Sequence, residues 1–170
     1  MVRPGTSLLA ATMLAAWISC TQAQAASGTI VALGASNTYG KGVVRNQAYP
    51  AQLEAILRAK GHTVRVVNAG INGNTTGQML ARLNGAVPRG TSAVILQPGG
   101  NDRRKGENDT AQNIAEIQNR LAAKGVRVIM MDNGMLRGLP KQPDGQHLTP
   151  EGYRMLAEAI AGQAEGALGR

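Results

Sequence analysis

Four short apolar runs recur along this chain, and each is followed by a polar or glycine-containing segment. The runs are rich in Val, Ile and Leu and are continuous, a pattern typical of parallel strands that are buried on both faces. They occupy residues 28–33, 64–67, 93–96 and 126–131. Segments of helical pattern separate them. This alternation predicts an α/β domain, a three-layer α/β/α sandwich around a short, four- to five-stranded parallel sheet.

The predicted helices carry appropriate residues at their ends. Pro50 stands in the first turn of one helix, and Gly61 and Gly125 follow the ends of two others, as helix geometry prefers. Thr149 is expected to cap the last helix, because its hydroxyl can accept from a free amide of the first turn. The four helices are predicted within residues 49–61, 76–83, 110–124 and 150–166.

The length suits one domain. The chain has 170 residues, 43% of them hydrophobic, so it can bury one continuous core and is too short for two ordinary domains. We therefore expect a single domain over residues 26–170, acting as a monomer.

Residues 1–25 are typical of an export signal. Arg3 supplies a positive start, residues 8–18 form a short apolar stretch, and residues 23–25 read Ala-Gln-Ala, a small-x-small cleavage site. We expect cleavage before Ala26 and a periplasmic or secreted protein. A lipid anchor at Cys20 is a less favoured alternative, because Trp17 stands where such signals usually carry an aliphatic residue.

The chain is basic, with 18 Lys and Arg residues against 10 Asp and Glu residues and a formal net charge of +8. Such a charge can attract nucleic acid, an anionic membrane surface or an acidic substrate, and does not choose among them. Most basic residues stand singly, and only 2% of residues are aromatic, which leaves no stacking platform for single-stranded nucleic acid. We expect no nucleic-acid partner, and a transient contact with a membrane surface stays open.

The polar segments after the strands supply the groups that a serine esterase needs. In an open parallel sheet, ligands bind beyond the carboxyl ends of the strands. Ser36 follows the first run and is the candidate nucleophile, His147 is the candidate base, and Asp144 can hold the second ring nitrogen of that histidine. The backbone amides of Ser36 and Gly73 and the carboxamide of Asn101 are candidate donors to an oxyanion.

These residues fall in four blocks that resemble those of the SGNH hydrolases, also called GDSL esterases. The blocks are Ser36, the segment Asn-Ala-Gly-x-x-Gly-x-Thr at 68–75, Gly-Gly-Asn-Asp at 99–102, and Asp-x-x-His at 144–147. The resemblance covers nearly all of residues 26–170 and is closest to the periplasmic arylesterase, thioesterase and lysophospholipase branch. It implies a flavodoxin-like fold, a catalytic triad of Ser36, Asp144 and His147, and an oxyanion hole of Ser36, Gly73 and Asn101. The implied substrate is a small-molecule or lipid ester, cleaved through an acyl-enzyme without a cofactor.

Two departures from the family pattern affect this prediction. Ala35 precedes the serine, where the family usually has aspartate. The segment 131–144 is short and shows no pattern of a fifth strand or of the usual substrate loops. We expect these changes to tune rate and substrate choice. Two alternatives stay open: a carbohydrate O-acetyl esterase of the same fold, and a binding module of this fold that has lost turnover.

Further polar residues are assigned more weakly. Asn37, Asn74, Arg103 and Arg104 are candidate substrate contacts, and the run Arg-Arg-Lys at 103–105 is expected near the mouth of the site, where it could attract an anionic part of a substrate. Residues 34–42 superficially resemble a phosphate-binding loop, but alanine and glycine stand at two of its defining positions. No cluster has metal-ligand spacing, so we expect no metal.

Overall fold

The computed structural model describes residues 27–169. The predicted export signal, with Trp17 and Cys20, lies outside these residues. Four parallel strands form one sheet in the order β2-β1-β3-β4. The strands are β1 (Ser27–Gly34), β2 (Thr63–Gly70), β3 (Thr91–Leu96) and β4 (Arg127–Met130). The predicted α/β/α fold is confirmed, with a sheet at the lower end of the predicted size.

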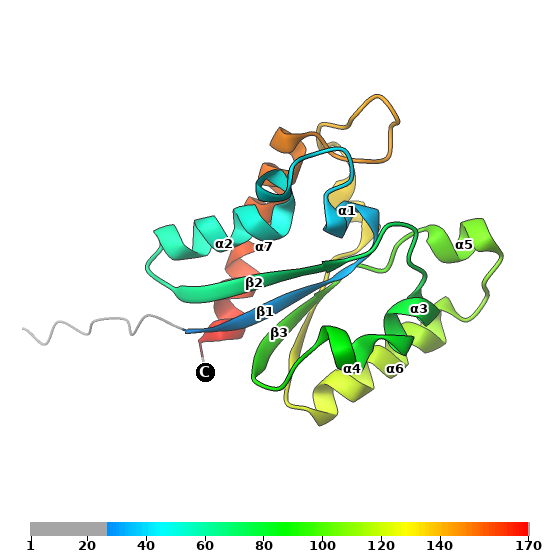
Figure 1. Ribbon diagram of the computed structural model, residues 1–170, viewed down its shortest axis with the longest axis horizontal. Coiled ribbons are helices and arrows are strands. Elements are labelled where there is room, and N and C mark those ends of the chain that lie inside the picture. Colours follow the sequence, from blue (N-terminus) through cyan, green and yellow to red (C-terminus); the bar gives the residue numbers. More distant parts are fainter. Residues whose placement is uncertain (1–26, 170) are drawn as a thin grey trace, which may run out of the picture.

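Helices cover both faces of this sheet (Figure 1). On one face lie α2 (Tyr49–Ala59) and α7 (Pro150–Leu168). On the other lie α3 (Thr76–Ala81), α4 (Leu83–Ala86) and α6 (Thr110–Ala123). Short helical turns stand at the strand ends and in loops, namely α1 (Ser36–Tyr39), η1 (Arg45–Gln47), α5 (Asn101–Lys105) and η2 (Asn133–Leu136).

The central strand β1 divides the core into two clusters. Ile30 and Ala32 pack with the cluster under α2 and α7, whereas Val31 and Leu33 pack with the cluster under α3 and α6. Successive side chains of a strand point to opposite faces, so a strand covered on both sides must be apolar at every position. This explains why the sequence shows a continuous apolar run at β1.

Two boundaries differ from the sequence prediction. The second strand extends to Gly70, so residues 68–70 belong to the strand and not to the loop after it. Gly70 is required there, because a Cβ atom at this position would lie 2.2 Å from the backbone nitrogen of Tyr39 in α1. The helix expected over 76–83 breaks at Arg82 into α3 and α4.

The segment between β4 and α7 contains no strand of the sheet. It carries η2 and one isolated antiparallel bridge between Lys141 and Leu148. The expected cap of α7 is present, since the Thr149 hydroxyl accepts from the amide of Gly152 at 3.1 Å. The irregular segment therefore ends in a fixed helix start, directly after the predicted base His147.

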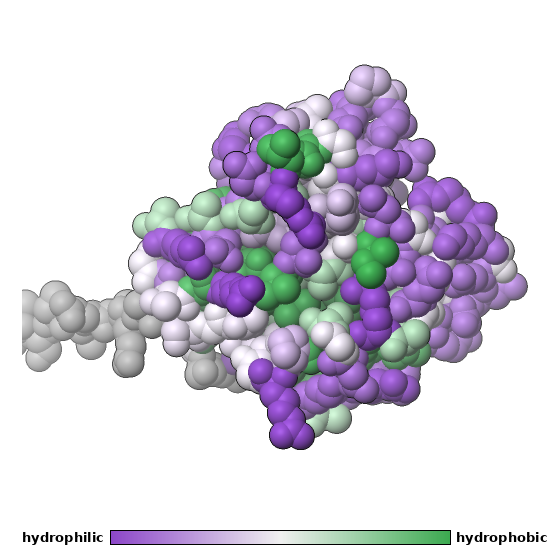
Figure 2. Space-filling view, in the orientation of Figure 1, coloured by the Kyte–Doolittle hydropathy of each residue, from purple (hydrophilic) through white to green (hydrophobic). Residues whose placement is uncertain are grey.

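The visible surface is largely hydrophilic, with separate small hydrophobic patches (Figure 2). Within residues 27–169, the exposed large apolar side chains are Tyr39, Val44, Ile71 and Met155. No helix in this part of the chain is both long enough and apolar enough to span a membrane.

Candidate active site

The predicted functional residues meet at the carboxyl edge of the sheet. Ser36 is the first residue of α1, directly beyond β1, and Asn101 is the first residue of α5, a few residues beyond β3. His147 lies three residues before α7. One cavity of about 370 Å³ is lined by all five residues predicted for the triad and the oxyanion hole, namely Ser36, Gly73, Asn101, Asp144 and His147.

Ser36, His147 and Asp144 form one continuous hydrogen-bonded row. His147 Nε2 lies 2.9 Å from Ser36 Oγ, and its Nδ1 lies 2.5 Å from Asp144 Oδ2. A carboxylate can only accept, so Nδ1 carries the ring proton and Nε2 is left to accept from the serine hydroxyl. The histidine is buried, with 6% of its surface exposed, so this tautomer is held in a fixed position.

Hydrogen bonds from residues of its own turn stabilise the ionised form of Asp144. The ring N–H of His147 and the backbone amides of His147 and Gln146 all donate to it, and these bonds hold the pKa of the Asp144 carboxyl well below its ordinary value. Hydrogen bonds to the charged form of a carboxyl favour that form. Its side chain is 42% exposed, so hydrogen bonding sets the charge, and burial does not.

Asn101 has an orientation that its neighbours determine. Its Nδ2 donates to the backbone oxygen of Asn74 at 2.8 Å, and its Oδ1 accepts from the guanidinium of Arg104. Arginine only donates and a carbonyl oxygen only accepts, so the amide cannot be reversed without losing both bonds. The second hydrogen of Nδ2 has no acceptor within residues 27–169. Arg104 is therefore a positioning residue for this donor.

The other predicted contact residues divide into two groups. Arg103, Arg104 and Asn37 line a second cavity beside Ser36. Asn74 lies elsewhere: it is buried, its Oδ1 accepts from Arg82 at 2.7 Å and its Nδ2 donates to Gln78 at 3.0 Å. The prediction that the Asn74 side chain contacts substrate is not supported by this geometry, because both of its amide atoms hold the loop together.

Several positioning residues were not identified from the sequence. Arg82 bridges the end of β1 and the loop after β2, since it donates to the carbonyl of Gly34 at 3.2 Å as well as to Asn74. Burial lowers the pKa of the Arg82 guanidinium. Tyr153 of α7 donates to Asn37 Oδ1 at 3.2 Å, and burial raises the pKa of Tyr153 to about 12, so it is a neutral donor. No sequence motif marks either role.

Ala35, where the family usually has aspartate, is 4% exposed and packs in the apolar cluster under α3 and α6. With alanine in place of aspartate, this apolar cluster contains no carboxylate that would need a hydrogen-bond partner. The bridge from Arg82 to Gly34, described above, holds the neighbouring backbone. Ser36 is therefore positioned by the strand end and by α1 without a carboxylate beside it.

No group of three or more His, Cys, Asp or Glu side chains within residues 27–169 could hold a metal ion. Residues 34–42, which superficially resemble a phosphate-binding loop, begin at the last residue of β1 and form the single turn α1. They end with Gly40 and Gly42 in the left-handed region. They pack on β2 through Gly70 and Tyr39.

The structure is a doubly wound α/β domain with a serine, a histidine and an aspartate in one hydrogen-bonded row at the sheet edge, and the comparisons with known proteins give the family. The model of the GDSL-like lipase/acylhydrolase family matches residues 32–168. The chain belongs to this family, and it is an ester-hydrolysing enzyme of the GDSL type.

Three similar proteins illustrate the relationship. Esterase TesA of Pseudomonas aeruginosa is 30% identical over 148 residues, which cover 85% of this chain and 71% of that protein. An arylesterase of Vibrio mimicus is 30% identical over 112 residues, which cover 64% of this chain and 56% of that protein. A crystal structure of a protein named TesA superposes on this chain with a TM-score of 0.73 at 24% identity, covering 82% of this chain and 99% of that one.

Proposed function

We propose that the protein is a serine esterase that cleaves carboxylic ester or thioester bonds through an acyl-enzyme on Ser36. The observation that carries this proposal is the hydrogen-bonded row from Asp144 through His147 to Ser36, with bonds of 2.5 and 2.9 Å. Nucleophile, base and orienting carboxylate in this order are the groups that activate a serine hydroxyl. The esterase and arylesterase names of the two relatives agree with the proposal.

In the first half of the reaction, Ser36 Oγ attacks the carbonyl carbon while His147 Nε2 takes the hydroxyl proton. The carbonyl oxygen becomes an oxyanion that accepts from the amides of Ser36 and Gly73 and from Asn101 Nδ2. The intermediate then collapses, the bond to the alcohol or thiol breaks, and His147 gives its proton to that leaving group. The product is an ester between the acyl group and Ser36.

In the second half, water takes the place of the alcohol. His147 Nε2 accepts a proton from the water as its oxygen attacks the acyl carbon, and the same oxyanion donors receive the charge. The bond to Ser36 Oγ breaks, the proton returns to that oxygen, and the free acid leaves. Asp144 remains a carboxylate throughout and stabilises the imidazolium that forms twice in the cycle.

The test is hydrolysis of a short-chain 4-nitrophenyl ester by the wild type and by Ser36→Ala. We expect the substitution to lower kcat by about 10⁴-fold or more, since it removes the nucleophile. Ser27→Ala is the matched control, because Ser27 is exposed at the opposite end of β1. Equal rates for Ser36→Ala and wild type would refute the assignment.

Covalent labelling separates an enzyme from a binding module of the same fold. A reactive phosphonate ester should add one phosphonyl group to the wild type and none to Ser36→Ala, as read by mass spectrometry of the peptides. A folded wild type that neither hydrolyses the ester nor accepts the label would be a binding module.

A further inference from the structure

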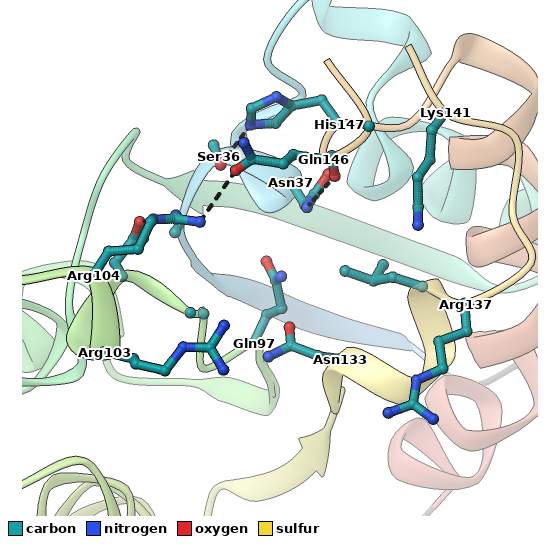
Figure 3. A pocket seen from close by; sticks show the side chains of 16 residues that line it. Ser36, Asn37, Gln97, Arg103, Arg104, Asn133, Arg137, Lys141, Gln146 and His147 are labelled. Carbon is teal, nitrogen blue, oxygen red and sulfur yellow. Dashed lines mark hydrogen bonds between the residues drawn. The ribbon is translucent and has the colours of Figure 1, made fainter. Parts of the chain in front are cut away.

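A second cavity, of about 400 Å³, adjoins Ser36 and His147 and is bordered by positive charge. Its lining includes Arg103, Arg104, Arg137 and Lys141, and no Asp or Glu side chain. Figure 3 shows Arg103 on one side of this cavity and Arg137 and Lys141 on the other. The charges come from two distant parts of the chain, α5 and the segment between β4 and α7.

These cations have no carboxylate partners in the described part of the chain. Arg58, Lys60, Arg120 and Arg154 each form ion pairs with glutamates, whereas none of the ion pairs within residues 27–169 involves an arginine or lysine of this cavity. Arg104 donates only to neutral groups, Gln146 at 3.1 Å and Asn101. Four cations that line one cavity with no carboxylate in that lining create a positive potential that favours an anion.

The floor of the cavity offers a further donor. Gln97, which follows β3, is 3% exposed and lines the cavity. Its Oε1 accepts from the Thr38 hydroxyl at 2.8 Å, and this bond fixes which end of the amide faces away from Thr38. Its Nε2 has no acceptor within residues 27–169 and is free to donate to a bound group. An anionic oxygen bound in the cavity can accept from this amide.

We propose that the ester cleaved at Ser36 carries an anionic group, a carboxylate or a phosphate, which binds in this cavity while its carbonyl lies at the oxyanion donors. This inference rests on the proposed esterase function and adds the substrate class. The sequence run at 103–105 contributes only in part: Arg103 and Arg104 line the cavity, Lys105 does not, and Arg137 and Lys141 complete the site.

The experiment compares matched anionic and neutral esters. For charge on the acyl side, the pair is mono-4-nitrophenyl glutarate and 4-nitrophenyl butyrate. For charge on the leaving group, the pairs are 4-acetoxybenzoate with its methyl ester, and 4-acetoxyphenyl phosphate with 4-acetoxyphenyl methyl ether. In each pair, the ratio of kcat/KM for the anionic ester to that for the neutral ester is measured in wild type, Arg137→Gln, Lys141→Gln and the double variant. Lys105→Gln is the control, because Lys105 is an exposed cation of α5 outside the cavity.

We expect at least one pair to give a ratio that falls about tenfold in the double variant, the size of one lost charge-assisted contact, and stays unchanged in Lys105→Gln. The pair that responds identifies the side of the bond and the anion. Ratios that are the same in wild type and double variant for all three pairs, or that fall equally in Lys105→Gln, would overturn the proposal. Because Ser36→Ala tests hydrolysis of the neutral ester, failure of this inference is distinguishable from failure of the esterase assignment.

Discussion

Asp144 holds His147 by two bonds, since its Oδ1 accepts the backbone amide of His147 at 2.9 Å and its Oδ2 accepts the ring Nδ1 at 2.5 Å. One side chain therefore sets both the backbone position and the ring orientation of the base, within a turn of four residues. This arrangement makes the base depend on local contacts. Ser36, 111 residues away in sequence, is brought to the ring by the fold.

Asp144→Asn should therefore impair catalysis more than stability. A carboxamide has one acceptor oxygen and cannot receive both the backbone amide and the ring N–H, so its NH₂ group would favour the wrong histidine tautomer. We expect kcat to fall by about 10³- to 10⁴-fold on a 4-nitrophenyl ester. Asp132→Asn is a suitable control, because Asp132 caps η2 in the same irregular segment. A loss of less than tenfold in Asp144→Asn would contradict the orienting role.

The lowered pKa of Asp144 also predicts a pH dependence of stability. A carboxyl whose pKa is lower in the folded state contributes stability above its unfolded pKa, about 3.9, and loses that contribution as pH falls toward the folded value. The difference in Tm between wild type and Asp144→Asn should therefore be constant between pH 7 and pH 5, because both pH values lie about one to three units above the unfolded pKa. The difference should shrink below about pH 4. A difference that grew on acidification would reverse the sign of the linkage. Thermal unfolding followed by circular dichroism measures it.

Arg104 should affect turnover through Asn101. Arg104→Met removes the donors that hold Asn101 Oδ1, so the carboxamide can rotate away from the oxyanion. We expect a loss of about tenfold in kcat on a neutral ester, with less change in KM, because the donor acts mainly in the transition state.

The control for this positioning role is the double variant Asn101→Ala/Arg104→Met. If Arg104 acts by positioning Asn101, Arg104→Met should have almost no further effect in an Asn101→Ala background, since residues in one network are not additive. If Arg104→Met instead causes the same loss of kcat in the Asn101→Ala background as in the wild type, Arg104 acts independently of the carboxamide.

The sheet, and the closeness of Ser36 to Asn101, could be predicted from local pattern and from the geometry of parallel sheets. A strand segment covered on both faces is apolar on both sides, and β1 shows this from Ile30 to Leu33. Residues just beyond parallel strands share one edge, so Ser36 and Asn101 could be placed together before their contacts were known. The family blocks then supplied the order of the remaining residues.

The positioning contacts of the site could not be predicted, because they join distant segments. Arg82 lies 48 residues from the carbonyl of Gly34 to which it donates. Arg104 is a predicted contact residue, but no sequence pattern indicates its bond to Gln146, 42 residues away. Arg137 and Lys141 stand in an irregular segment without periodicity, so no pattern indicates that they face Arg103 across a cavity. The end of β2 was missed because asparagine and glycine are usually loop residues, whereas Gly70 is needed for close packing against α1.

Asp102 links α5 to the start of α3, and its loss should lower stability. It is 1% exposed and accepts from both the backbone amide of Thr76, at 3.1 Å, and the Thr76 hydroxyl. Asn113 completes the group by donating to that hydroxyl at 3.3 Å. In Asp102→Asn, a carboxamide oxygen in the place of Oδ1 keeps both Thr76 donors. The NH₂ group then replaces Oδ2, which accepts from the Thr76 amide at 3.2 Å, and both bonds lose their charged acceptor.

We expect Asp102→Asn to lower the free energy of unfolding by about 1 kcal/mol, because hydrogen bonds to a charged acceptor contribute more than bonds to a neutral one. Urea denaturation of the wild type and the variant measures this difference. Asp109→Asn, an exposed carboxylate beside the first turn of α6, is the matched control and should change stability by less than about 0.5 kcal/mol. Since α3 begins just after Gly73 and Asn74, Asp102→Asn should also lower kcat. Equal stability of Asp102→Asn and Asp109→Asn would show that the buried carboxylate does not hold α3 and α5 together.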